Sequence, residues 1–218
     1  MTWIGNFRDR PARRLVQLYV GLVLYGVSMA LMIEASLGLN PWDVFHQGVA
    51  RRAGLSIGTV TILVGAAVLL LWIPLRQRPG LGTVSNVLVI GLAVDAALAV
   101  LPTVTPLAGR VGLLAAGIVL NGMATGLYIG ARFGPGPRDG LMTGLVALRP
   151  GRLSIRAVRT AIELAVLAAG WLLGGTVGLG TVAYALLIGP LAHVFIPMFT
   201  VAPRVQAPAA TTTPSWKS

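Results

Sequence analysis

Six long apolar segments dominate the sequence and restrict the folds open to it. An α-helix needs about 20 apolar residues to cross a bilayer, whereas a membrane-spanning strand needs about ten and alternates in polarity. The segments are continuous and of helical length, so we predict an all-α membrane protein. The six transmembrane helices are expected at residues 14–35, 56–74, 82–101, 111–131, 154–173 and 180–199.

Composition agrees with a chain surrounded by lipid. Hydrophobic residues make up 56% of the sequence, charged residues 11%, and the mean hydropathy is +0.82, whereas soluble domains are about 25% charged. The net charge of +11 comes mainly from Arg residues in the short segments between apolar stretches. A nucleic-acid-binding protein would carry its basic residues on a polar face. We therefore expect a lipid bilayer, and no nucleic acid, as partner.

The distribution of basic residues predicts the orientation. If the N-terminus is cytoplasmic, the outside segments hold only Arg51, Arg52 and Arg110, and the remaining basic residues lie inside. The positive-inside rule then predicts that both termini are cytoplasmic. The basic N-terminus at 1–13 and the Pro-, Ala- and Thr-rich tail at 202–218 are assigned to that side, and the tail is expected to be disordered.

An internal duplication relates the two halves of the chain. Residues 14–50 align with 110–146 with 13 identities in 37 pairs, and residues 55–97 align with 153–195 with 16 in 43. Many identities are Gly, Pro, Asp, Ser or Arg, which shared apolar composition would not bring into one register.

Each copy contains three apolar segments, so the second copy enters the membrane from the opposite side. We predict two inverted three-helix repeats, at 14–101 and 110–199, each with a short broken or re-entrant helix. This architecture is found in many secondary transporters. It is also a simple way to build a stable helical bundle.

A Pro- and Gly-rich break follows the first apolar segment of each copy. Both breaks contain Pro-x-Asp, beginning at Pro41 and at Pro137. Proline suits the first turn of a helix, and Asp in that turn complements the positive end of the helix dipole. Short helices are therefore predicted at about 41–51 and 137–147.

Two interpretations of the breaks stay open. In one, each break is only a helix start at the membrane surface. In the other, the two helix starts converge near the bilayer centre and line a substrate site. That site would use Asn40, Trp42, Asp43, His46, Arg138 and Asp139.

Charged residues within the fifth apolar segment extend the predicted site. Glu163 is costly inside a membrane unless it is paired, so a functional role is one interpretation. Arg159 lies four residues earlier on the same helix face. The alternative is an internal ion pair, with Arg159 reaching towards the interface. Both residues are included among the predicted substrate-binding residues.

Two further polar positions correspond between the copies. Asp95 and His193 are equivalent in the alignment and form a weak candidate for a proton relay. The alternatives are a polar contact between helices or a position near the membrane surface. Asn86 and Asn121 either bridge helices or contact a substrate, and packing between helices is the preferred interpretation.

Catalytic and metal chemistry have little basis in this sequence. There is no Cys and there are only two His residues, so disulfides and thiolate chemistry are excluded and a zinc site is not expected. Phosphate-loop and dinucleotide-binding motifs are absent. We expect a protein that is not an enzyme and has no cofactor.

Two stretches resemble a known family. The first runs from Gly38 to Val44 and continues at 54–58; the second runs from Gly136 to Met142 and continues through Glu163 to Gly175. Together they are similar to the YczE-like family of bacterial membrane proteins, and distantly to the YitT group. The resemblance covers about residues 14–200 and implies a bacterial plasma-membrane protein without supplying a mechanism.

The leading functional hypothesis is a small secondary transporter or permease for a small solute. One alternative is a non-transporting accessory protein that assists an enzyme or an export complex. Another is the substrate-binding membrane component of an energy-coupled importer. A homodimer and a partner protein are both compatible with the sequence.

Overall fold

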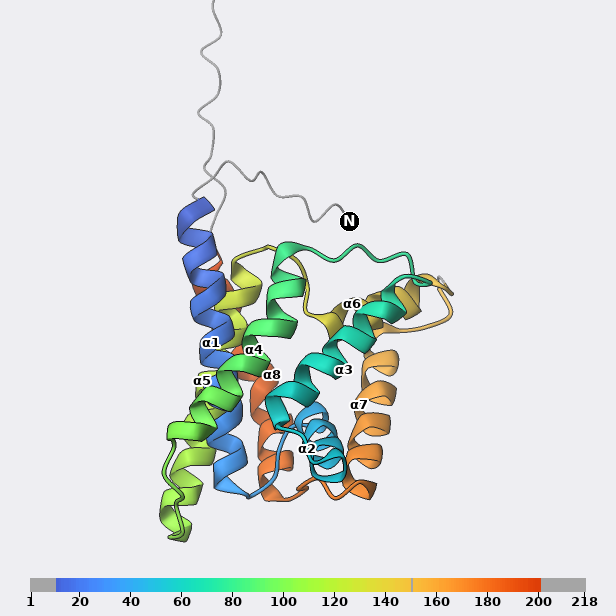
Figure 1. Ribbon diagram of the computed structural model, residues 1–218. Helices are drawn as coiled ribbons and strands as arrows, with labels where there is room; N and C mark the ends of the chain where they lie inside the picture. Colours follow the sequence, from blue (N-terminus) through green and yellow to red (C-terminus); the bar gives the residue numbers. More distant parts are fainter. Residues whose placement is uncertain (1–10, 150, 201–218) are drawn as a thin grey trace, which may run out of the picture.

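The computed structural model describes residues 11–149 and 151–200, where all regular secondary structure is α-helical (Figure 1). All six apolar segments and both predicted short helices form helices. The predicted tail at 202–218 and most of the predicted basic N-terminus lie outside the described residues. The helices are α1 (Pro11–Ala35), α2 (Pro41–Ala53), α3 (Ile57–Trp72), α4 (Leu81–Val100), α5 (Leu107–Gly130), α6 (Pro137–Ala147), α7 (Ile155–Leu172) and α8 (Leu179–Phe199).

Membrane-spanning length and composition are met by four helices in the described part of the chain, namely α1, α4, α5 and α8. The pair α2 and α3, bent by 114° at the turn between them, gives a fifth candidate if it is one broken span. Helix α3 has 16 residues, about 24 Å of helix against a hydrocarbon core of about 30 Å. Helix α7 contains three charged residues, Arg156, Arg159 and Glu163. The described residues therefore give four or five candidate spans, and the six-span architecture stays a prediction.

Local sequence explains where the short helices begin and end. Asn40 caps α2 by accepting a hydrogen bond from the backbone N–H of Asp43 over 3.0 Å, and Pro41 takes the first helical position. Gly54 ends α2 with φ of 67°, a left-handed conformation that favours glycine. In the second copy, Pro137 again opens the helix, after an N-cap at Gly136 that has no side chain.

Helices α1 and α5 pack against each other, and equivalent arginines join them. Arg14, near the start of α1, donates to the carbonyl of Ala131 just beyond α5 over 3.0 Å. Arg110, near the start of α5, donates to the carbonyl of Ala35 at the end of α1 over 2.7 Å. The two helices are therefore antiparallel. Helix α4 packs against α1, and α8 packs against α5 in the same way.

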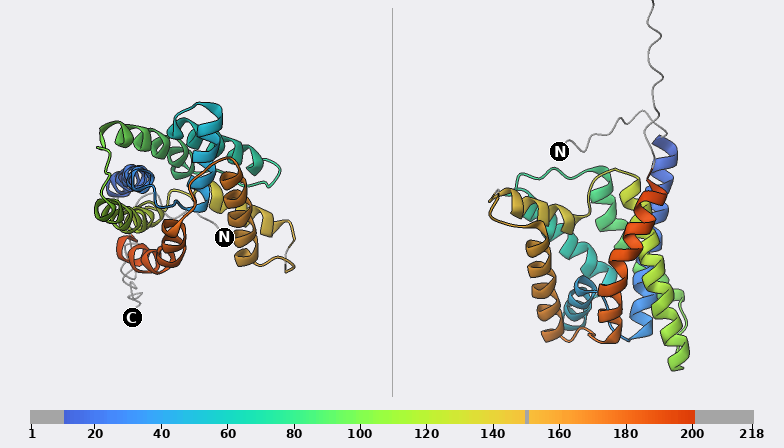
Figure 2. Two further views of the ribbon diagram at one scale, coloured as in Figure 1. Left: turned by 90° about the horizontal axis from the view of Figure 1, so that it is seen from below. Right: turned by 180° about the vertical axis from the view of Figure 1, so that it is seen from behind.

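The outer helices differ between the two halves. Helix α3 lies against α4, and a Cβ atom on Gly58 would come within 2.0 Å of the Gly91 carbonyl oxygen. The equivalent positions in the second half are Arg156 and Gly189, and a Cβ on Gly189 would meet no atom within 4 Å. Helix α7 packs against α2 instead of along α8 (Figure 2).

Candidate functional site

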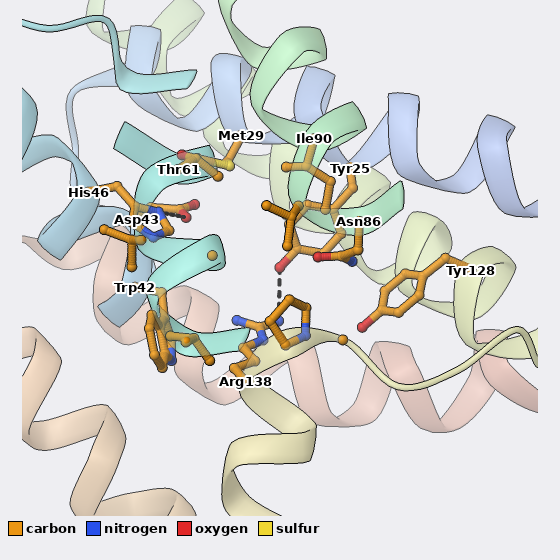
Figure 3. Close-up of a pocket in the computed structure, with 16 residues that line it drawn as sticks. Tyr25, Met29, Trp42, Asp43, His46, Thr61, Asn86, Ile90, Tyr128 and Arg138 are labelled. Atoms are coloured by element: carbon orange, nitrogen blue, oxygen red, sulfur yellow. Dashed lines mark hydrogen bonds and ion pairs between the residues drawn. The ribbon is translucent and has the colours of Figure 1, made fainter. Parts of the chain in front are cut away.

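A cavity lies where the two short helices meet α1, α3, α4 and α5 (Figure 3). It contains about 600 Å³ of space not filled by protein atoms, counting the part that is open to the surroundings. Helices α2 and α6 both contribute residues from their N-terminal turns. The structure thus brings the two Pro-x-Asp breaks, from opposite halves of the sequence, to one place.

Trp42, Asp43 and His46 of α2 form one wall of the cavity. All three are buried, with exposed fractions of 8%, 3% and 8%. One carboxylate oxygen of Asp43 accepts a hydrogen bond from the side-chain amide of Asn40. The other lies 3.7 Å from Nδ1 of His46, an ion pair if the imidazole is protonated. Asn40 does not line the cavity, but it holds Asp43 in the first turn of α2.

Arg138 of α6 lies between this wall and the opposite wall, which includes Tyr25 and Asn86 (Figure 3). Its guanidinium donates to the Tyr25 hydroxyl oxygen over 2.9 Å and lies 6.0 Å from the centre of that ring. The start of α6 is held by Trp72, whose indole N–H donates to the carbonyl of Pro137 over 3.0 Å. Arg138 therefore projects from a firmly packed helix start.

The polar atoms of this cavity are incompletely paired. Among the described residues, Nε1 of Trp42 and Nδ1 of His46 are buried without a hydrogen-bond partner. The ion pairs within 4 Å in the same residues are His46 with Asp43 and Arg159 with Glu163, so Arg138 has no carboxylate at that distance. Buried polar groups are usually hydrogen-bonded. The cavity therefore contains buried polar atoms that the described residues leave unpaired.

The other predicted site residues lie outside the cavity lining. Asp139 follows Arg138, and a Cβ on Gly136 would lie 3.2 Å from its Oδ2 atom, so its carboxylate is next to the cavity wall. Arg159 and Glu163 form the anticipated pair on α7, with a 3.0 Å contact. Their side chains are 58% and 33% exposed, and neither residue lines the cavity.

Asp95 and His193 are not brought together by any contact in the described residues. The carboxylate of Asp95 accepts hydrogen bonds from the Ser56 hydroxyl and from the Gly58 N–H over 2.8 Å. It therefore stabilises the start of α3. His193 is exposed on α8. The packing role expected for Asn121 agrees with its hydrogen bonds, which join α1, α5 and α8.

Several cavity residues were not anticipated from the sequence. Tyr25, Thr61 and Tyr128 line the cavity from three different helices. Asn86 also lines it, a position that agrees with the less favoured of its two interpretations. A polar aromatic residue within an apolar span is a weak signal for Tyr25 and Tyr128. The sequence contains no comparable signal for Thr61.

Four or five candidate spans, with a partly polar cavity lined by the first turns of two short helices, are those of a multi-pass helical membrane protein. Residues 12–197 match a family of unknown function, DUF6198, and the chain belongs to this family. It is 33% identical over 181 residues to the uncharacterized membrane protein YczE of Bacillus subtilis, covering 82% of this chain and 83% of that protein. The resemblance to the YczE-like family is thereby confirmed.

Two other relatives extend the comparison. An uncharacterized protein of Haemophilus influenzae is 39% identical over 188 residues, covering 86% of this chain and 85% of that protein. The uncharacterized protein YyaS of Bacillus subtilis is 26% identical over 183 residues, covering 82% and 90%. No solved structure shows significant similarity to the chain.

Proposed function

We propose that the chain crosses the bacterial plasma membrane six times, as two inverted three-helix repeats with both termini in the cytoplasm. The antiparallel arrangement of α1 and α5 supports this topology. The start of α1 and the end of α8 lie at the same end of the bundle, where Gln17 donates to the carbonyl of Phe199 over 2.8 Å. At the opposite end, the basic residues of the described chain are Arg51, Arg52 and Arg110, as the positive-inside rule requires of an external face.

Within this architecture, the chain acts as a small secondary transporter or permease that moves a small solute without converting it chemically. One observation carries the proposal: the N-terminal turns of α2 and α6, one from each copy, meet at a single cavity with buried polar side chains. Substrate sites of inverted-repeat transporters lie at the repeat interface and are formed by interrupted helices.

The different packing of α3 and α7 indicates how access to the cavity alternates between the two sides of the membrane. Helix α3 lies against α4, whereas α7 stands away from α8. If α7 closed onto α8 in the same manner, Arg159 and Glu163 would take positions equivalent to those of Thr61 and Gly65, which line the cavity. We propose that the two arrangements exchange, so that the cavity opens to one side of the membrane at a time.

Filling the cavity tests the transport proposal. Val64 lines the cavity, whereas the neighbouring Leu63 is 54% exposed on the outside of α3. In proteoliposomes screened with labelled organic acids, amino acids and cations, Val64→Trp should abolish solute uptake because the indole occupies the site. Leu63→Trp, the matched control, should transport normally. If no solute accumulates above empty liposomes, the proposal is wrong; a stable partner in detergent pull-downs would then favour the accessory-protein alternative.

Cross-linking tests the alternation. The sequence has no Cys, so a thiol reagent can react only with the Cys residues that mutagenesis introduces. Ser56 of the turn before α3 contacts Asp95 of α4, and the equivalent positions are Ser154 and His193. A short bifunctional thiol reagent should join Ser154→Cys to His193→Cys in liposomes and stop transport, because it traps α7 against α8. Ser56→Cys with Asp95→Cys is the positive control. Cross-linking of the control pair alone would rule the alternation out.

A further inference from the structure

Arg138 and Trp42, which both line the cavity, have N–H donors for which the described residues provide no acceptor. Arg138 carries several N–H donors, and the described residues provide one hydrogen-bond acceptor, the Tyr25 hydroxyl, and no carboxylate within 4 Å. Trp42 lines the same cavity, is 8% exposed, and leaves its Nε1–H without an acceptor. Both groups need an acceptor, and the guanidinium of Arg138, which is half-buried, is also stabilised by a negative charge.

The remaining charges limit how negative that acceptor can be. Asp43 lines the same cavity, and its carboxylate is held in place by Asn40 and lies near His46. A ligand with two negative charges would be repelled by Asp43 after neutralising Arg138. Asp139, whose carboxylate lies beside Gly136 of the cavity lining, adds to this repulsion. One negative charge is therefore the most that a ligand placed against Arg138 can carry.

The rest of the lining indicates the body of the ligand. Met29, Val64, Val68, Val87 and Ile90 supply apolar surface from three helices. Small-molecule sites typically combine such walls with a few polar groups that fix orientation. An apolar body of a few carbons fits this lining better than a strongly hydrated inorganic ion.

We propose that the cavity binds a small organic monocarboxylate, with its carboxylate against Arg138 and the Trp42 N–H and its short alkyl or aryl body against the apolar wall. This assignment rests on the site of the proposed function and names its substrate class. Arginine suits the role because its planar guanidinium matches a carboxylate and forms charge-assisted hydrogen bonds.

Calorimetric titration of the purified full-length chain in nanodiscs tests the assignment without requiring transport. Isovalerate should bind, and isovaleramide, which has the same shape without the charge, should bind about tenfold more weakly or worse, as expected for a lost charge-assisted hydrogen bond. Leucine and inorganic phosphate should bind less tightly than isovalerate, because one adds a cation and the other adds charge and removes the apolar body. Equal binding of the amide, or tighter binding of leucine or phosphate, would overturn the proposal.

Substitutions locate the binding to this cavity. Arg138→Gln should weaken isovalerate binding about tenfold or more, Arg138→Lys should retain part of it, and Trp42→Phe should weaken it by removing the N–H donor. Arg149→Gln, at an exposed arginine beyond α6, is the matched control and should bind as the parent does. Since a misfolded variant would also lose binding, thermal unfolding of Arg138→Gln is measured alongside. If Arg138→Gln is unstable, the binding affinity of Arg138→Lys decides the test. Binding that is unchanged in Arg138→Lys and Trp42→Phe would contradict the assignment.

These experiments distinguish failure of the carboxylate assignment from failure of the transport proposal. Isovalerate binding that depends on Arg138, without uptake by proteoliposomes, would support the carboxylate site and refute the transporter. Uptake of another solute, together with no binding of isovalerate, would refute the carboxylate assignment and leave transport standing.

Discussion

Replacing Gly91 by Leu is expected to destabilise the protein by about 3 kcal/mol, the upper part of the range for overpacking a tight contact. A Cβ atom at Gly91 would lie 2.5 Å from Cγ1 of Ile62 and 2.6 Å from the Gly58 carbonyl oxygen. Helices α3 and α4 would have to separate to admit the larger side chain. The measurement is unfolding by SDS in mixed micelles, followed by far-ultraviolet circular dichroism.

Gly189 provides the matched control for this substitution. It occupies the equivalent position on α8, but a Cβ there would meet nothing within 4 Å. Gly189→Leu should therefore change stability by no more than about 0.5 kcal/mol. If α7 closes onto α8 during transport, the same variant should still lose uptake, because the leucine blocks that closure. A large loss of stability at Gly189 would show that α7 already packs on α8.

The second large effect is expected where α3 meets α6. A Cβ on Gly140 would lie 1.9 Å from Cζ2 of Trp72, a side chain that is 2% exposed and has no room to move. Gly140→Val should cost about 3 kcal/mol through overpacking. Trp72→Ala should cost about 4 kcal/mol, because it leaves a cavity and removes the hydrogen bond to Pro137.

Combining the two changes distinguishes overpacking from other causes. The equivalent contact, between α7 and α2, pairs Gly170 with Val44. There the glycine replaces the tryptophan and the larger residue replaces the glycine. The double variant Gly140→Val with Trp72→Ala should therefore be more stable than the sum of the single effects predicts, and the mutant cycle should show favourable coupling. Strict additivity would mean that Trp72 and Gly140 do not constrain each other.

The helices were predictable because their signals are local. Bilayer-length apolar runs, a proline at the first helical position, and caps such as Asn40 act within a few residues. The meeting of the two breaks at one cavity depended on the duplication, a long-range signal that the sequence happened to contain. The sequence could therefore predict that one site contains Trp42, Asp43, His46 and Arg138.

The remaining cavity residues depend on helix rotation, which apolar sequence hardly records. A membrane helix is apolar on the lipid side as well as the protein side, so periodicity does not show that Tyr25 and Thr61 face inward. The pair Arg159 and Glu163 illustrates the same limit. Its spacing of four residues predicted the contact, but its exposed position depends on where α7 packs.

The reciprocal bonds between α1 and α5 have a consequence for biosynthesis. The ribosome synthesises the first half of the chain before the second. Until the second half is made, the carbonyl of Ala35 cannot bond to Arg110, and Arg14 cannot bond to the end of α5. Each half thus provides the arginine that bonds to a helix end in the other half. We therefore expect the first half to lack both of these end contacts until translation has delivered the second half.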